Sequence, residues 1–188
     1  ILGCGSSVGV PRIDNFWGEC KKKEMNIRSR CSAFISKGTN SILIDASPDI
    51  RNQFLSNKIQ NVSSVLLTHK HADQTLGLFE LRPFFWKYKK RINVYSDLHT
   101  IRYLNKTQGY LFNKGDDYPA ILNGNVISNK FSLGKDKSKI NFSAISLKHG
   151  KIKSLAYIFD KTAYVSDRND LSIINFEEFK KLNYLILD

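Results

Sequence analysis

The chain has 188 residues, of which 41% are hydrophobic and 24% are charged, and its formal net charge is +12. This length lets one domain, residues 1–188, bury a sizeable core, and the composition is typical of a soluble globular protein. No apolar run approaches the ~18 residues that cross a bilayer, so a membrane-spanning class is excluded and we expect no membrane partner.

The excess of positive charge attracts anions at long range. One interpretation is a phosphate-bearing or nucleic-acid partner. The other is the biased composition of a chain crowded with Lys, Asn and Ile, and charge alone does not choose between them. Three cysteines, Cys4, Cys20 and Cys31, form no paired disulfide framework. They favour a reducing compartment, and we therefore expect a cytoplasmic protein.

The N-terminal stretch ILGCGSSVGVP has neither a basic leader nor a long apolar run, so we expect no secretory signal. Its third glycine comes at Gly9, one place too late for the G-x-G-x-x-G pattern of dinucleotide-binding folds. Gly3 and Gly5 instead predict a close approach of the backbone to the loop that follows residue 68. The amides of Ser6 and Ser7 are candidates for contact with a phosphate, and a plain tight turn is the alternative.

The next stretch, CSAFISKGTNSILIDAS, alternates apolar and polar residues, which predicts two strands joined by a turn at Gly38. SPDIRNQFLSNK predicts a helix, with Ser47 as its N-cap and Pro48 at its first position. The buried face of this helix is expected to contain Ile50, Phe54 and Leu55. VSSVLLT is a short, nearly continuous apolar run, the pattern of a strand buried on both faces.

The second half of the chain alternates between helix and strand patterns. QTLGLFELRPFFWKY predicts a helix that Gly77 weakens and Pro83 ends or bends. KINFSAISLKH, SLAYIFD and TAYVSD predict three strands, the last two joined by a tight turn near Lys161, and NFEEFKKLN predicts a short amphipathic helix. Strands outnumber helices, which favours an α/β layered fold. The apolar run YLILD predicts a buried strand that stops at Asp188, so we expect the C-terminal part to be truncated.

Directly after VSSVLLT comes THKHAD. In extended backbone, residues i and i+2 point the same way, so His69 and His71 can reach one point, with Asp73 available to a second point nearby. Neutral imidazole and carboxylate are ligands of Zn²⁺, Mn²⁺ or iron. The alternative is a surface loop where two histidines meet by chance. However, the chain contains only four histidines, and two of them stand here at ligand spacing.

The stretch LLTHKHADQTLG resembles the HxHxDH signature of the metallo-β-lactamase fold, a superfamily of mostly metal-dependent hydrolases. ILIDAS is similar to the preceding strand that ends in an aspartate, LKHG supplies His149, and AYVSD supplies Asp167. The closest likeness is to the PhnP-type phosphodiesterases, which open cyclic phosphate esters of ribose. It is carried by GCGSSVGVP, DASPDIRNQF, GLFELRPF and YLFNKGDDYPAIL. The resemblance implies an αββα sandwich over residues 1–188.

The resemblance also implies roles for individual residues. A first metal ion, Zn²⁺ or Mn²⁺, is held by His69, His71 and His149. A second ion is bound by Asp73, and Asp167 bridges both ions, which makes these two carboxylates the catalytic ones. The implied reaction is two-metal hydrolysis, in which hydroxide between ions ~3.5–4 Å apart attacks phosphorus in line.

Gln74 stands where the signature has a histidine. Its amide oxygen is a weaker and harder donor than imidazole, so we expect the second ion to bind less tightly and to shift toward Mn²⁺ or Mg²⁺. The last histidine of the superfamily is expected beyond Asp188. One good metal site and one weakened site are therefore predicted. Asp45, at the end of ILIDAS, is implied to orient a metal ligand by hydrogen bonds.

Other features allow two interpretations each. Arg28 and Arg30 are candidates for positioning an anionic substrate, or ordinary surface residues. FFWKYKKR, residues 84–91, either stacks bases and neutralises phosphates or ends a helix whose aromatic rings pack inward while its lysines reach outward. Cys20 lies where PhnP-type enzymes have a cysteine cluster for a structural zinc, but the other thiolates are not here. His99 is expected on a surface helix without a role.

These observations predict a metal-dependent hydrolase, most closely a phosphodiesterase that acts on a small cyclic phosphate ester. An RNA-processing nuclease of the same fold is the first alternative, and it predicts one exposed face lined by Lys87, Lys89, Lys90 and Arg91. A degenerate member that binds a ligand without turnover is the second alternative, and Gln74 favours it. A homodimer is left open.

Overall fold

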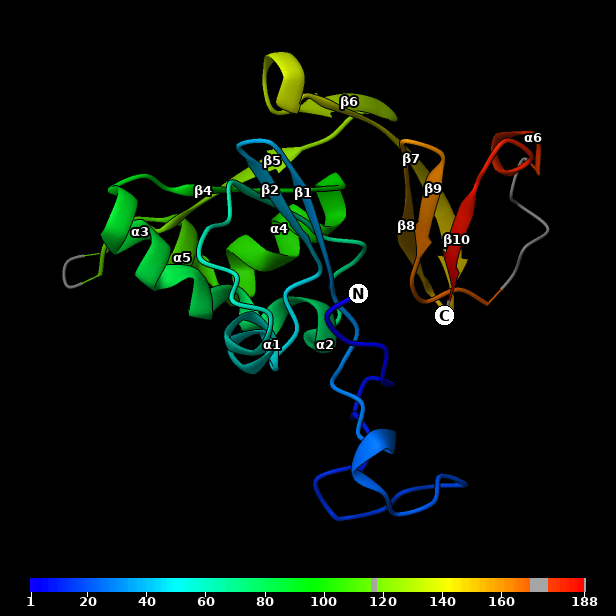
Figure 1. The fold of residues 1–188 in the computed structure, drawn as a ribbon. Coiled ribbons are helices and arrows are strands. Elements are labelled where there is room, and N and C mark those ends of the chain that lie inside the picture. The colour runs from blue at the N-terminus through cyan, green and yellow to red at the C-terminus, as the bar shows by residue number, and fades with distance from the viewer. Residues whose placement is uncertain (116–117, 170–175, 188) are drawn as a thin grey trace.

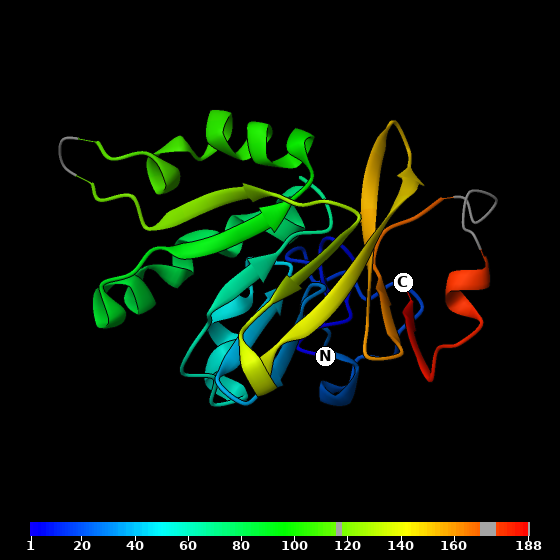
Figure 2. The same ribbon diagram turned by 90° about the horizontal axis from the view of Figure 1, so that it is seen from above.

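The computed structural model describes residues 1–115, 118–169 and 176–187. In these ranges, two five-stranded sheets pack face to face, and helices lie on their outer sides (Figures 1 and 2). No helix in this part of the chain combines the length and the apolar character that a bilayer crossing needs.

The first sheet has the strand order β1-β2-β3-β4-β5. These strands are Ala33–Lys37, Asn40–Ile44, Ser64–Leu66, Ile92–Ser96 and Leu122–Val126. β1 and β2 form the predicted hairpin, with Gly38 at positive φ in the turn, and β2 to β5 run parallel. The helices that follow its strands are α1 (Ile50–Ser56), α2 (Ala72–Thr75), η2 (Leu76–Leu81), α3 (Arg82–Tyr88), α4 (Leu98–Thr107) and α5 (Gly109–Phe112).

The second sheet has the order β10-β9-β8-β7-β6. Its strands are β6 (Lys130–Leu133), β7 (Ile140–His149), β8 (Ile152–Phe159), β9 (Thr162–Val165) and β10 (Tyr184–Leu187). β6 to β9 are antiparallel, with the predicted tight turn at Lys161 between β8 and β9, and β10 runs parallel to β9. The short elements η1 (Glu24–Asn26), η3 (Asp136–Ser138) and α6 (Phe176–Phe179) complete the structure.

Strand alternation distributes the apolar side chains over three buried layers. On β2, Leu43 packs toward the helices, whereas Ile42 and Ile44 pack toward the second sheet. On β9, Tyr164 lies in the layer between the sheets, and Val165 packs outward with residues that include Phe179 and Leu182. Helix, sheet, sheet and helix therefore follow one another, which confirms the predicted αββα sandwich.

Helix α1 differs from its prediction in its N-cap and in its buried face. Its N-cap is Asp49 rather than Ser47, because the Ser47 hydroxyl accepts the Asp49 N–H at 3.2 Å and closes a turn before the helix starts. Ile50 and Phe54 are buried as predicted, but Leu55 is 64% exposed. One residue corresponds to about 100° of helical rotation, which carries Leu55 out of the face that Phe54 occupies.

The single helix predicted over residues 74–88 is divided into α2, η2 and α3. Gly77 lies where this segment touches the loop after β2, and its N–H donates to the Ala46 carbonyl at 2.8 Å. A Cβ at Gly77 would lie 2.0 Å from the Ser47 carbonyl oxygen, so the contact requires glycine. Pro83 lies in the first turn of α3, where its missing N–H leaves no helical bond unmade, and it does not end the helix.

Two other strand predictions differ from the structure. β10 is the edge strand of its sheet, and Tyr184 is 69% exposed, so the apolar run is not buried there. β4, β5 and β6 were not predicted. The β5 sequence, LNGNV, contains glycine and asparagine, which are depleted in strands.

The N-terminal segment forms an arm, residues 1–32, that pairs with itself, and its outer part, residues 11–27, projects away from the two sheets (Figure 1). Isolated bridges join Gly3 to Ser32, Gly5 to Arg30 and Val10 to Arg28. A Cβ at Gly3 would lie 2.1 Å from the Arg30 carbonyl oxygen. The predicted close approach is therefore present, but it involves residues 28–30 and not the histidine loop.

Candidate metal centre

Three of the four histidines meet at the edge where the two sheets come together. His69 and His71 lie in the loop between β3 and α2, and His149 is the last residue of β7 in the other sheet. The ring centroids are 4.5 Å apart for His69 and His71, and 5.0 Å apart for each of these rings and His149. One ligand nitrogen from each ring lies within 4.8 Å of the other two.

The spacing of these nitrogens fits a metal ion. Nε2 of His149 lies 3.3 Å from Nδ1 of His71. Tetrahedral ligands about 2.0–2.1 Å from Zn²⁺ are about 3.3–3.4 Å from one another, so these two atoms already have the separation of neighbouring ligands. The buried Nε2 of His69 has no hydrogen-bond partner among the described residues. This unpartnered nitrogen can therefore serve as the third histidine ligand of the ion.

The hydroxyl of Thr68 determines which His69 nitrogen carries the proton. It donates to the Asp45 carboxylate oxygens at 3.1 and 3.0 Å and lies 3.0 Å from Nδ1 of His69. Because its single proton goes to the carboxylate, the hydroxyl accepts from Nδ1–H, and Nε2 keeps its lone pair. Burial lowers the pKa of His69 to about 4, assisted by His71 and His149 and opposed by Asp167. The ring is therefore neutral at pH 7, as a metal ligand must be.

Asp45 lies directly beneath the histidine loop and is fully buried. The backbone N–H of Thr68 donates to it at 2.8 Å, in addition to the two contacts from the Thr68 hydroxyl. Burial raises the pKa of Asp45 well above its ordinary value, and the bonds from Thr68 act in the opposite direction. Asp45 thus reaches His69 through Thr68, at the distance where a residue orients a ligand without touching the ion.

The histidine loop is also fastened to the second sheet. The N–H of Leu155 in β8 donates to the Thr68 carbonyl at 2.8 Å, and the Tyr157 hydroxyl donates to the Leu67 carbonyl at 2.7 Å. Tyr157 is fully buried, and burial raises its pKa well above the ordinary value, so its hydroxyl stays a donor. These two bonds fix the loop that carries His69 relative to the sheet that carries His149.

Gln74 and Asp167 lie together at one side of the three rings. Nε2 of Gln74 donates to Oδ2 of Asp167 at 3.2 Å, and the Ser166 hydroxyl donates to the same oxygen at 2.8 Å. Oδ1 of Asp167 lies 3.8 Å from Nε2 of His149. Gln74 is fully buried, and its Oε1 has no partner among the described residues. The amide therefore faces Asp167 with its donor side.

The remaining residues with a predicted role are more distant or engaged elsewhere. Asp73 is half-buried in α2 and lies outside the group whose ligand atoms come within 4.8 Å in the described chain. Arg30 donates to both oxygens of Asp49, at 2.9 and 2.6 Å. Nη1 of Arg28 donates to the carbonyls of Met25 and Ile27 at 2.6 and 2.9 Å.

The N-terminal arm forms a groove in which several of the predicted substrate contacts meet. This groove has a volume of about 830 Å³, and its lining includes Ser7, Arg28, Arg30 and Asp49. The Asp73 charge helps to raise the pKa of Arg30, after the larger effect of its bonds to Asp49. The charge of Asp73 on α2, next to the histidine loop, therefore acts on a residue that lines the groove. Ser6 does not line the groove, and its carbonyl accepts the Gly9 N–H at 2.9 Å in a turn.

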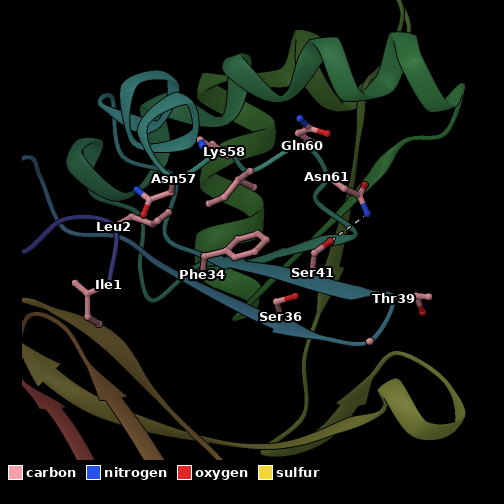
Figure 3. A pocket seen from close by; sticks show the side chains of 12 residues that line it. Ile1, Leu2, Phe34, Ser36, Thr39, Ser41, Asn57, Lys58, Gln60 and Asn61 are labelled. Atoms are coloured by element: carbon pink, nitrogen blue, oxygen red, sulfur yellow. Dashed lines mark hydrogen bonds between the residues drawn. The ribbon is translucent and has the colours of Figure 1, made fainter.

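A second hollow, of about 690 Å³, lies beside strand β1 (Figure 3). Phe34 and Leu2 supply its apolar wall, and Ser41 and Asn61 are joined across it by a hydrogen bond of 3.2 Å. Among the described residues that line it, Lys58 has the only charged side chain, and none of the histidines is present. The hollow therefore has no metal-ligating group and is unrelated to the histidine cluster.

Sequence reasoning did not assign a role to Thr68, Ser166 or Asn169. The Thr68 and Ser166 hydroxyls lie 3.3 Å apart and connect Asp45 to Asp167. The Asn169 side chain accepts from the Gly150 N–H, and the backbone N–H of Asn169 donates to the Lys148 carbonyl at 3.0 Å, so Asn169 holds the turn next to His149. The sequence offered one signal for Thr68 and Ser166, namely that each directly precedes a predicted metal ligand.

Comparison with known proteins identifies a family and a curated relative. The beta-lactamase superfamily domain matches residues 40–188. An octanoyltransferase from Porphyromonas gingivalis is 28% identical over all of this chain, and the match covers 38% of that protein. The chain therefore spans less than half the length of this curated relative.

Two solved structures share the whole architecture. A diphosphatase from the PhnP family superposes with a TM-score of 0.78 and 26% identity, over 98% of this chain and 70% of that one. Zn²⁺-bound PqqB from Methylobacterium extorquens superposes with a TM-score of 0.73 and 16% identity, over 100% of this chain and 71% of that one. The first is similar in sequence as well as in fold, and the second shows the fold alone.

Proposed function

Because this chain belongs to the beta-lactamase superfamily and has a PhnP-like metallo-β-lactamase fold, we propose that it is a metal-dependent hydrolase that cleaves a small phosphate ester. The observation that carries the proposal is the convergence of His69, His71 and His149 at ligand spacing. The similarity to a diphosphatase supports a substrate in which phosphorus is attacked by water. The octanoyltransferase activity is not carried over, because only 38% of that protein is matched.

The three histidines would hold one divalent ion, Zn²⁺ or Mn²⁺. When bound, such an ion supplies a Lewis acid that polarises a phosphoryl oxygen and lowers the pKa of water. Thr68 and Asp45 keep His69 in the tautomer that presents Nε2. The role of this chain's own residues is thus to supply neutral imidazoles in a fixed arrangement.

Asp167 is the residue we propose to handle the proton of the attacking water. Its Oδ2 is held by Gln74 and Ser166, which leaves Oδ1 on the side of His149. A carboxylate fixed by two donors keeps its orientation while it accepts a proton. Asp167 therefore acts as the general base in this proposal.

A second ion would use Asp73, Gln74 and Asp167 and would bind more weakly. Gln74 can offer its amide oxygen to an ion only if the amide turns over and gives up its bond to Asp167. That rearrangement costs the hydrogen bond, in addition to the weaker donor strength of an amide compared with imidazole. We therefore propose that one tightly bound ion suffices for the basal reaction.

We propose that the groove of the N-terminal arm binds the part of the substrate that lies beyond the phosphate under attack. Its lining includes Ser7 and Arg28, and Arg30 is already neutralised by Asp49. One arginine without a carboxylate partner favours a substrate of modest negative charge over a polyanion. A small phosphate ester fits this requirement.

An RNA-processing nuclease remains the second candidate, and one observation favours it. The guanidinium of Arg82 lies 4.5 Å from the ring centroids of both Trp86 and Tyr118, and Lys70 lies 5.0 Å from the ring of Tyr103. Trp86 is 49% exposed, and the basic residues 87 and 89–91 are exposed as well. Exposed rings next to cations can stack bases and neutralise phosphates.

The test of the proposed hydrolase combines metal content with turnover. The full chain is loaded with Zn²⁺ or Mn²⁺, the ion is counted by elemental analysis, and hydrolysis of an aryl phosphodiester is measured. His71→Ala should lose the bound ion and all hydrolysis. His99→Ala is the matched control, because His99 is exposed on α4 and distant in sequence from the cluster.

The outcomes separate the three candidates. Full activity in His71→Ala would overturn the hydrolase assignment. An ion bound by the three histidines without turnover of any phosphodiester would favour a binding protein on this scaffold. Cleavage of single-stranded RNA that weakens steeply with salt and is impaired by Trp86→Ala would favour the nuclease.

A further inference from the structure

Apart from the metal centre, two cysteines lie opposite each other in the N-terminal arm. Cys4 stands between Gly3 and Gly5, and Cys31 stands between Arg30 and Ser32. An antiparallel bridge joins Gly3 to Ser32 and a parallel bridge joins Gly5 to Arg30, so the two cysteines lie between two bridges on adjacent backbone segments. Neither cysteine is in a disulfide.

The backbone geometry at this position suits a disulfide. Gly3 and Ser32 exchange two hydrogen bonds of 3.2 and 3.3 Å, which makes them a hydrogen-bonded pair of the antiparallel type. On the other side of the cysteines, Gly5 and Arg30 form a bridge of the parallel type, and the Gly5 N–H donates to the Ser29 carbonyl at 2.8 Å. Disulfides bridge Cα atoms about 4.4–6.8 Å apart. Because the backbone is bridged on both sides of Cys4 and Cys31, the two residues are held on neighbouring segments, which is the arrangement that a disulfide needs.

Both side chains also point to the same side of the arm. Cys4 and Cys31 line one small cavity of about 70 Å³, together with Tyr164, Ile186 and Leu187 of the second sheet. Cys4 is exposed, whereas Cys31 is half-buried and its Sγ lies 2.9 Å from the Tyr164 hydroxyl. The Cys4 thiol is thus accessible to a reagent in solution, and the less exposed Cys31 lines the same cavity.

We propose that Cys4 and Cys31 form a reversible disulfide site whose oxidant is a small-molecule disulfide of the glutathione type. The Cys4 thiolate attacks one sulfur of that disulfide, which forms a mixed disulfide and releases one small thiol. Cys31 then attacks Sγ of Cys4, forms the intramolecular bond and releases the second small thiol. The two cysteines together lose two electrons and two protons, and the oxidant gains both as its two thiols.

The bond has a structural consequence near the metal centre. It closes a loop that contains the whole projecting part of the arm, residues 11–27, and so restricts the unfolded chain. It also takes Sγ of Cys31 away from Tyr164, on the strand that leads to Asp167. Oxidation therefore acts on two segments that border the groove and the histidine cluster, without touching a proposed metal ligand.

The site is tested with the full-length chain. The reduced protein is incubated with glutathione disulfide, the remaining thiols are alkylated, and the intact mass and proteolytic peptides are analysed. We expect the loss of two hydrogen atoms, one peptide pair that links Cys4 to Cys31, and an alkylated Cys20. Reduction with dithiothreitol should restore three alkylated thiols.

Single substitutions provide the controls. Cys4→Ser and Cys31→Ser should each abolish the intramolecular link, whereas Cys20→Ser should leave it unchanged. The oxidised wild type should also melt at a higher temperature than the reduced wild type, and Cys4→Ser should show no such difference. Glutathione adducts on Cys4 without a Cys4–Cys31 link, or a link that involves Cys20, would overturn the proposal.

Discussion

The contact between Thr68, Asp45 and His69 makes the sharpest prediction, for the substitution Thr68→Val. Valine keeps the volume of threonine but removes the hydroxyl that donates to both oxygens of Asp45 and meets Nδ1 of His69. Asp45 keeps the Thr68 N–H, because that bond comes from the backbone. The substitution therefore isolates one hydroxyl in a buried site.

Two effects are expected from this loss. Removing one partner and leaving a buried polar group unsatisfied costs about 1–3 kcal/mol, so the metal-free protein should lose about 2 kcal/mol of unfolding free energy. With a urea m value of about 2 kcal/mol/M, this shifts the unfolding midpoint by about 1 M. The imidazole of His69 also loses the partner that fixes its tautomer, which typically weakens metal affinity by about 10–100-fold.

The assay is a Zn²⁺ titration against a chromogenic chelator, together with urea unfolding of the metal-free protein. Thr68→Ser keeps the hydroxyl and should retain most of the metal affinity. Thr100→Val removes a hydroxyl at an equally buried position on α4 and reports the general cost of that replacement. If Thr68→Val binds Zn²⁺ as tightly as the wild type, the hydroxyl does not orient His69 and the reasoning fails.

Three further predictions concern neighbouring features. Gly77→Ala would place a Cβ 2.0 Å from the Ser47 carbonyl oxygen. We expect the unfolding free energy measured in urea to fall by about 2–4 kcal/mol, because overpacking and the loss of a backbone hydrogen bond both destabilise the fold. The bonds from Arg30 hold the pKa of Asp49 below its ordinary value, so this ion pair stabilises the fold above the unfolded pKa of about 4, and the stabilisation is lost as pH falls through the folded pKa. The stability difference between the wild type and Asp49→Asn should therefore be largest at neutral pH and shrink in acid. Gln74→His should add a second ion that survives dialysis, counted by elemental analysis.

Each of these predictions has its own control. Gly109→Ala introduces a Cβ whose nearest neighbour is 3.6 Å away and should change stability by less than about 0.5 kcal/mol. A stability difference for Asp49→Asn that does not change between pH 7 and pH 3 would exclude the ion pair as its source. An unchanged ion count in Gln74→His would mean that residue 74 does not face the second ion.

The parts of the site that sequence reasoning predicted are local in sequence. The spacing of His69 and His71 after a buried strand is visible in six consecutive residues, and the strand patterns around it predict the layered fold. His149 and Asp167 were assigned through the resemblance to a family, because nothing in their immediate sequence points to the loop that follows β3.

The parts that were not predicted depend on contacts between distant segments. The Thr68 hydroxyl reaches Asp45 across 23 positions and Ser166 across 98. Gln74 was assigned as a weak ligand through its oxygen, whereas its amide nitrogen bonds to Asp167. The orientation of an amide depends on the charge beside it, and a sequence pattern carries no information on that neighbour. The start of α1 was predicted wrongly for a related reason, because the Ser47 hydroxyl closes a turn onto the Asp49 N–H before the helix begins.

Because the histidine cluster is divided between the two sheets, metal affinity depends on how the sheets pack against each other. His149 belongs to one sheet and the loop with His69 to the other, and the layer between them contains side chains such as Leu66, Phe142 and Tyr157. A cavity made in that layer would let the sheets slide, and the nitrogens would drift from their 3.3 Å spacing. Residues that never meet the ion can thus tune how tightly it is held.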